Sequence, residues 1–314
     1  MYKKILFLLL VVLFSFSCSK KEYPSRNITL VVPYSPGGAS DQAARVFAQL
    51  LEKEIGVPVV VENRTGGAGS VGLAYVQKSK PDGYTMAYMP VESAMLEALG
   101  YVELKPEDFS FVGRATIVPA TVTVRSDSPW NTFEEFIQYA KANPNKIRVG
   151  NSGPGSIWHM AAAVLGKEFG VEFTHVPFDG GAAAVAGLMG NHIEAVTVSE
   201  TEVRSGVADG SLRILTTMGD QRGILSKDIP TLTELGYDIV MMGWGGFAIA
   251  KGAEKDILDK LVPASEKVLQ SKEFQDQMIE RGLQPGYLDA ASMQEFANEQ
   301  YNIFMQLSKE INIK

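Results

Sequence analysis

Two glycine-rich turns contain the groups of this chain that are best suited to binding an anion. They read PGGASD at residues 36–41 and NSGPGS at residues 151–156. Glycine leaves the backbone open to close approach, and the start of a helix adds free N–H groups and the positive end of its dipole. Neither turn contains Lys or Arg, so we expect dipoles, water and the hydroxyls of Ser40, Ser152 and Ser156 to hold a carboxylate or phosphate. Taken singly, each turn is equally well explained as a tight connection that binds nothing.

The same succession of elements surrounds both turns, which indicates two similar halves. An apolar strand precedes each turn, an amphipathic helix follows it, and a glycine, Gly56 or Gly170, ends that helix. We expect Ser40 or Asp41 to cap the first helix and Ser156 to cap the second. Strands that alternate with helices predict an α/β fold, in which ligands bind beyond the carboxyl ends of the strands. The doubled turn therefore predicts two lobes that grip one anion.

Two extended segments are expected to cross between these lobes, at residues 119–125 and 245–250. They divide the chain into a discontinuous lobe, residues 23–123 plus 245–314, and a continuous lobe, residues 124–244. Helices are expected over residues 255–270, 271–281 and 292–309.

The N-terminus indicates export. Lys3 and Lys4 precede an apolar run over residues 5–16, which is short for a spanning helix and typical of a signal peptide. Cys18 follows it and is the only cysteine, so we expect residues 1–17 to be removed, Cys18 to be lipidated and residues 18–22 to form a tether. Ser15 and Phe16 depart from the usual residues before a lipidated cysteine, and ordinary signal cleavage nearby is the alternative. A net charge of −7 argues against nucleic acid as a partner.

Signatures of enzymes are weak in this sequence. The GAGSVG stretch at residues 67–72 does not directly follow its strand, and Ser152 lies in GNSGP rather than in GxSxG. His159, His175 and His192 lack the spacing of metal ligands. We therefore expect no catalytic residue, no metal and no cofactor.

A few further side chains are candidates for the cleft. Asp179, in the Phe178-Asp179-Gly180 turn, is predicted to accept a hydrogen bond from the far end of the ligand or else to be a solvated turn carboxylate; Ser199 is the other candidate there. Tyr34 and Phe178 occupy matching places before glycine turns, and are expected either to wall the cleft or to pack. Trp244 is interpreted as core or hinge packing.

At this point the sequence resembles the substrate-binding proteins of tripartite tricarboxylate transporters, the Bug receptor family. The stretches that carry the resemblance cover nearly the whole mature chain in order; they include VVPYSPGGASDQAAR, VVVENRTGGAGSVG, KPDGYT, GNSGPGS with His159, HVPFDGG and IPTLTELGY. The resemblance implies a periplasmic-binding-protein fold of two lobes that close on a small carboxylate, with a large and a small membrane subunit as partners. By motif match it implies ligand contacts from Tyr34, Pro36, Gly37, Gly38, Ala39, Ser40, Asp41, Ser152, Gly153, Gly155, Ser156, His159, Phe178, Asp179 and Gly180.

The leading hypothesis is thus a monomeric exported lipoprotein, in the periplasm or on the cell surface, that delivers a di- or tricarboxylate or a related organic acid to a transporter. An exported hydrolase that uses Ser152 or Asp41, and a ligand sensor for a two-component kinase, are the alternatives.

Overall fold

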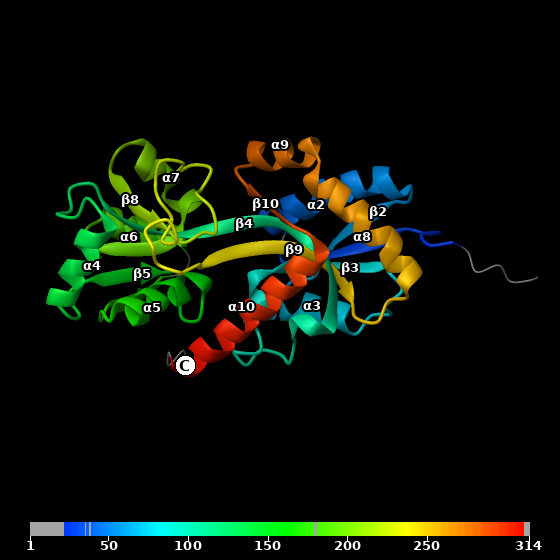
Figure 1. The fold of residues 1–314 in the computed structure, drawn as a ribbon, viewed down its shortest axis with the longest axis horizontal. Coiled ribbons are helices and arrows are strands. Elements are labelled where there is room, and N and C mark those ends of the chain that lie inside the picture. The colour runs from blue at the N-terminus through cyan, green and yellow to red at the C-terminus, as the bar shows by residue number, and fades with distance from the viewer. Residues whose placement is uncertain (1–21, 35, 38, 179–180, 311–314) are drawn as a thin grey trace, which may run out of the picture.

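The computed structural model describes residues 22–34, 36, 37, 39–178 and 181–310. Two groups of helices and strands lie at the two ends of a pair of long strands, β4 (Phe109–Arg125) and β9 (Met242–Ala250), which run side by side through the molecule (Figure 1). β4 and β9 pair in antiparallel register from Phe109 opposite Ala250 to Pro119 opposite Met242. Both strands are longer than the crossing segments predicted from the sequence.

The bend in β4 explains why its first half was not recognised as the same strand. Its register against β9 shifts between Phe111 and Gly113 and again between Arg114 and Thr116. Gly113 has a φ of 140°, which a residue with a side chain rarely adopts. Such bulges break the alternation on which strand prediction depends.

The first group is built on parallel strands. β1 (Ile28–Val32) pairs with β2 (Val59–Asn63) on one side and with β3 (Thr85–Pro90) on the other, and β3 then pairs with β9. Helices α2 (Ala39–Ile55), α3 (Ser70–Gln77), α8 (Lys255–Gln270) and α9 (Lys272–Glu280) cover these strands, and β10 (Gln284–Leu288) pairs with β4. Phe47 of α2 stacks on Phe247 of β9, with ring centroids 3.7 Å apart, in the core between helix and sheet.

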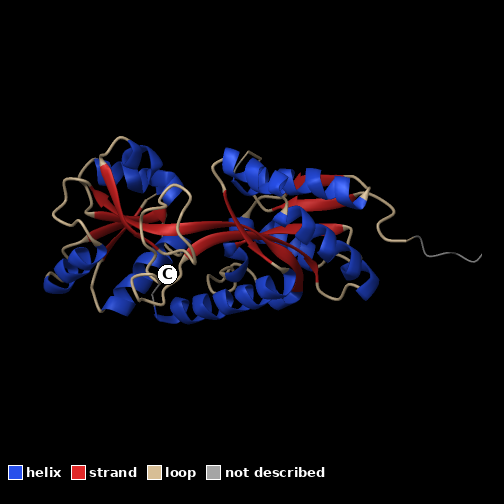
Figure 2. Ribbon diagram, turned by 45° about the horizontal axis from the view of Figure 1, so that its top comes forward, coloured by secondary structure: helices blue, strands red, loops and turns tan. Residues whose placement is uncertain are grey.

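The second group repeats this arrangement. β5 (Arg148–Asn151) pairs in parallel with β6 (Thr174–Pro177) and with β7 (Ala195–Ser199), and β4 pairs with β7 and with β8 (Leu212–Thr217). The covering helices are α4 (Phe133–Ala142), α5 (Ile157–Phe169), α6 (Gly181–Met189) and α7 (Glu200–Ala208). Figure 2 shows the strands passing continuously between the two groups while the helices flank them.

The C-terminal helix connects the two groups. α10 (Ala290–Glu310) begins beside the first group and ends near α5 of the second (Figure 1). There Lys167 forms an ion pair with Glu310, at 2.7 Å between Nζ and Oε2. The three C-terminal helices agree with the sequence prediction to within one or two residues at either end, since each has a polar face and an apolar face. Within the part of the chain that the structure describes, no helix combines the length and the apolar character needed to cross a membrane.

The two helix starts differ in how well they were predicted. Ser156 is the N-cap of α5, as predicted, and Gly170 ends that helix with a φ of 61°. α2 begins at Ala39, so the prediction that Ser40 or Asp41 caps it was wrong. Both residues lie in the first turn of the helix, where an acidic side chain is also stabilised by the dipole.

Candidate functional site

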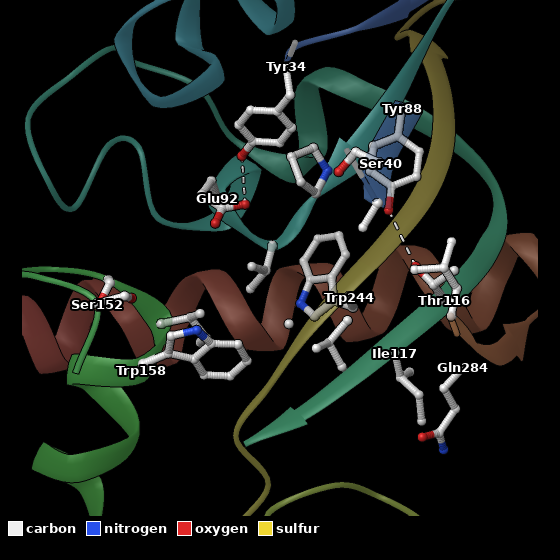
Figure 3. A pocket seen from close by; sticks show the side chains of 18 residues that line it. Tyr34, Ser40, Tyr88, Glu92, Thr116, Ile117, Ser152, Trp158, Trp244 and Gln284 are labelled. Atoms are coloured by element: carbon white, nitrogen blue, oxygen red, sulfur yellow. Dashed lines mark hydrogen bonds between the residues drawn. The ribbon is translucent and has the colours of Figure 1, made fainter. Parts of the chain in front are cut away.

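A cavity of about 300 Å³ lies between the two groups, where α2 and α5 begin (Figure 3). The first group contributes Tyr34, Ala39 and Ser40, and the second contributes Ser152, Ser156 and Trp158. Thr116 and Ile117 of β4 and Trp244 of β9 form part of the wall where the long strands pass. Segments that are far apart in the sequence therefore meet at one small space.

The starts of both helices face this cavity. Ala39 and Ser40 are the first two residues of α2, and Ile157 and Trp158 are the first two of α5. The first four N–H groups of a helix have no acceptor within the helix, and the dipole gives this end a partial positive charge. The cavity thus has two sources of backbone donors, one from either half of the chain.

The glycine N–H groups of the first turn are arranged differently from the prediction. Gly37 donates to Oδ2 of Asp41 at 2.8 Å, and Asp41 also accepts from Arg45 and Asn63. Burial on its own would raise the pKa of Asp41, but the hydrogen bonds from these three partners outweigh it and hold the pKa below its usual value. Asp41 therefore shapes the turn as an ionised acceptor, and Pro36 and Gly37 lie exposed beside the cavity rather than in its wall.

The second turn is closed by its own side chains in the same way. Gly153 donates to Oδ1 of Asn151 at 3.1 Å, and Gly155 donates to Nδ1 of His159 at 3.1 Å. The hydroxyl of Ser156 donates to the carbonyl of Gly153 and accepts from the N–H of His159. The N–H groups of Gly37, Gly153 and Gly155, predicted to face the ligand, are thus engaged inside the turns, and residues at the helix starts line the cavity.

The other predicted residues lie further away. Ser199 caps α7, exchanges hydrogen bonds with Glu202 and lines an adjoining cavity of about 250 Å³. Phe178 is partly buried and packs against the core of the second group, so close to Gly187 that a Cβ placed there would lie 2.7 Å from its ring. It is therefore not a partner to Tyr34 in the cavity wall. Gly38, Asp179, Gly180 and Cys18 lie outside the described residues.

Glu92 is the main residue that sequence reasoning missed. It lies in a short 3₁₀ helix, Val91–Ala94, directly after β3, and its Oε2 accepts a hydrogen bond from the hydroxyl of Tyr34 at 2.8 Å (Figure 3). Burial raises the pKa of Glu92, and burial together with Glu92 raises the pKa of Tyr34. The signal was available, because a polar residue just beyond a parallel strand lies at the edge where ligands bind.

Tryptophans supply much of the apolar wall. Trp158 follows the cap of α5. Trp244 is 3% exposed and belongs to the buried core, as interpreted from the sequence, and it also lines the cavity. Tyr88 of β3 adds a hydroxyl that lies 3.3 Å from Oγ1 of Thr116. An apolar wall with a few convergent polar groups is typical of small-molecule sites.

Known proteins share this architecture. The family model described as the tripartite tricarboxylate transporter family receptor matches residues 43–313. The UPF0065 protein in the gbd 5′ region of Cupriavidus necator is 32% identical over 280 residues, which make up 88% of this chain and 85% of that protein. Two solved structures are similar over 92% of this chain. A TctC solute-binding protein from Polaromonas, without ligand, has a TM-score of 0.87 and 36% identity over 100% of its chain. An R. palustris protein with adipate has a TM-score of 0.70 and 26% identity over 98% of its chain.

These similarities confirm the mixed α/β, periplasmic-binding-protein-like fold that the resemblance implied.

Proposed function

Because the chain belongs to the tripartite tricarboxylate transporter receptor family, whose members are solute-binding receptors and not enzymes, we propose that it captures a small carboxylate in the cavity at the starts of α2 and α5. The observation that carries this proposal is the pair of helix starts, one from either half of the chain, on one cavity. Each can donate backbone hydrogen bonds to a carboxylate without a Lys or Arg side chain.

Size and relatives support a small organic acid as the ligand. A cavity of about 300 Å³ is at the lower end of the range for small-molecule sites. The R. palustris protein that is 26% identical to this chain was solved with adipate. In this proposal the receptor delivers its ligand to the large and small membrane subunits of a tripartite transporter. Sensing of the ligand for a two-component kinase is the remaining alternative.

The arrangement of the long strands supports a closing motion. We propose that residues 23–123 plus 245–314 form one lobe and residues 124–244 the other, with β4 and β9 as the crossing strands. A ligand that contacts both helix starts binds the closed form better than the open form, and it shifts the population toward the closed form by that difference in affinity.

The proposed cellular location rests on the N-terminal sequence. A signal peptide over residues 1–17 and a lipid on Cys18 would place the receptor outside the cytoplasm, in the periplasm or on the cell surface, and attach it to a membrane. In cells that express Cys18→Ser, the protein is expected in the soluble fraction rather than in the membrane fraction. Equal retention of the variant and the wild type contradicts the anchor.

The binding function is tested by thermal unfolding of the purified mature protein. Adipate, succinate, citrate, glutamate and aromatic acids, added one at a time at millimolar concentration, should raise the melting temperature for at least one acid, because a ligand of the folded state stabilises it. Neutral amides of the same acids are the control and should have no effect. The proposal fails if no carboxylate in the panel changes the melting temperature. Size-exclusion chromatography tests the expected monomer.

A further inference from the structure

Among the described residues of the binding cavity, one carboxylate faces the cavity and no cationic side chain lines it. We propose that Glu92 makes this receptor select a ligand that carries an ammonium group next to its carboxylate, a zwitterion of the amino-acid type, over a plain di- or tricarboxylate. This inference rests on the proposed function, since it names the class of carboxylate that the cavity takes.

The charges around Glu92 favour a cationic group. Among the described residues that line the 300 Å³ cavity, Glu92 is the only charged side chain. Glu92 also borders a neighbouring cavity of about 750 Å³, in which Glu97 is the other charged residue of the described wall. A carboxylate withdrawn from water is unfavourable unless it is paired. An ammonium group on the ligand would supply that pairing, whereas a second ligand carboxylate would place two like charges together.

The hydrogen bond from Tyr34 orients the carboxylate of Glu92. The Tyr34 hydroxyl donates to Oε2 of Glu92 at 2.8 Å, which uses the single proton of the phenol. The second oxygen of Glu92 points away from Tyr34 in Figure 3. Tyr34 holds the carboxylate in that orientation, and we assign the second oxygen the role of acceptor for a donor on the ligand.

An independent observation on the neighbouring strand β9 favours a ligand that also offers an acceptor. Nε1 of Trp244 is buried and has no hydrogen-bond partner within the described part of the chain, and the residue is 3% exposed. Figure 3 shows this nitrogen turned toward the side of the cavity where Trp158 lies. The indole N–H can only donate, and a buried donor without an acceptor is costly. A carboxylate oxygen of the ligand would satisfy it.

The cavity therefore offers both donors and a negatively charged acceptor to a ligand. Trp244 and the helix starts at Ser40 and Ile157 offer donors, and Glu92 offers an acceptor with negative charge. A zwitterion presents a carboxylate to the donors and an ammonium to the acceptor at the same time. A site that is built to pair a charged group of the ligand rejects the analogue that lacks it, because the site's own group is then left unpaired.

Calorimetric titration of the full mature protein at pH 7.5 with matched pairs of acids tests this proposal. The pairs are L-glutamate with glutarate, L-2-aminoadipate with adipate, and L-phenylalanine with 3-phenylpropanoate, which differ only by the ammonium group. We expect the wild type to bind the amino acid of at least one pair about tenfold or more tightly than its partner. In Glu92→Gln, which keeps the size and the acceptor for Tyr34, this preference should disappear, through weaker binding of the amino acid and not of the deaminated acid.

The control is Glu97→Gln, which removes a carboxylate from the neighbouring cavity and should keep the preference. The inference is overturned if the wild type prefers the deaminated acids, or if Glu92→Gln keeps the wild-type preference. In both of these cases a carboxylate still binds, so the proposed receptor function stands. If neither series binds to the wild type, the inference and the proposed function fall together. The affinities of the wild type for an amino acid and for its deaminated partner can be compared without any variant. This comparison tests the preference for a zwitterion even if Glu92→Gln folds poorly.

Discussion

Arg114 donates a hydrogen bond from Nη2 to Oδ2 of Asp220 at 2.9 Å, although 106 residues separate them in the sequence. Arg114 lies on β4 with its side chain 3% exposed, while Asp220 lies in the loop after β8 with its side chain 37% exposed. Nε of the same guanidinium donates to the carbonyl of Gly286 on β10 at 2.7 Å. One buried cation thus ties a crossing strand to a loop of the second group.

Removal of the partner of this cation should destabilise the fold. Burial lowers the pKa of Arg114, and Asp220 opposes that shift. In Asp220→Asn the guanidinium stays buried with its charge less well compensated, so we expect a loss of about 1–3 kcal/mol in the free energy of unfolding, measured in urea. Asp276→Asn breaks an exposed helical pair with Lys272 and should cost less than about 0.5 kcal/mol. Equal losses in the two variants would contradict a structural role for the Arg114 pair.

A proline at the start of α5 tests the backbone donor directly. Ile157 is the first residue of the helix, where proline is tolerated, and Ser156 before it has the extended backbone that a following proline requires. Ile157→Pro deletes one N–H group that belongs to the cavity wall. Relative to Ile157→Ala, which also shortens the side chain but keeps the N–H, carboxylate affinity should fall about tenfold to a hundredfold in titration calorimetry.

That comparison has a clear contrary outcome. If the proline and alanine variants bind the carboxylate equally, the start of α5 does not hold the ligand.

Glu92 should lower the stability of the ligand-free protein at neutral and alkaline pH. Burial raises its pKa in the folded protein above the ordinary value of 4.5. The free energy of unfolding therefore decreases as the pH rises from about 4.5 through the folded pKa. Glu92→Gln should therefore unfold at a higher temperature than the wild type at pH 8, by about 2 °C for each kcal/mol regained. At pH 4 the two proteins should differ little. A gain of the same size at both pH values would show that ionisation is not its cause.

The histidine pair predicts that the free energy of unfolding falls as the pH falls, which is opposite to the effect of Glu92. The rings of His159 and His175 lie 5.0 Å apart. Partial burial of the His175 ring, together with His159, lowers the pKa of His175 to about 4, although the residue as a whole is exposed, so solvent reduces the effect on stability. The unfolded chain takes up this proton near pH 6.5, so stability present above pH 6.5 is lost as the pH falls toward 4. His175→Gln should lose less stability than the wild type between pH 7 and pH 4.5 in urea titrations. Equal losses of stability in the variant and the wild type would indicate that His175 does not contribute to the pH dependence of stability.

Local signals in the sequence determined much of the fold. Ser156 and Gly170 mark the two ends of α5 because a serine hydroxyl and a glycine with positive φ meet needs that arise within one helical turn. The apolar strand expected before each turn and the three helices expected at the C-terminal end are present as β1, β5 and α8 to α10. The turns after β1 and β5 lie beside the cavity because both follow the carboxyl ends of parallel strands.

The composition of the site was decided by the tertiary structure. Glu92, Thr116 and Trp244 come from separate segments, and they share a wall only because β3, β4 and β9 lie next to one another in the sheet. Phe178 and Tyr34 have the same local sequence setting, yet one packs beneath Gly187 and the other reaches Glu92, because their neighbours across the sheet differ. Burial, charge pairing and cavity shape depend on such distant contacts, and local spacing carries no information about them.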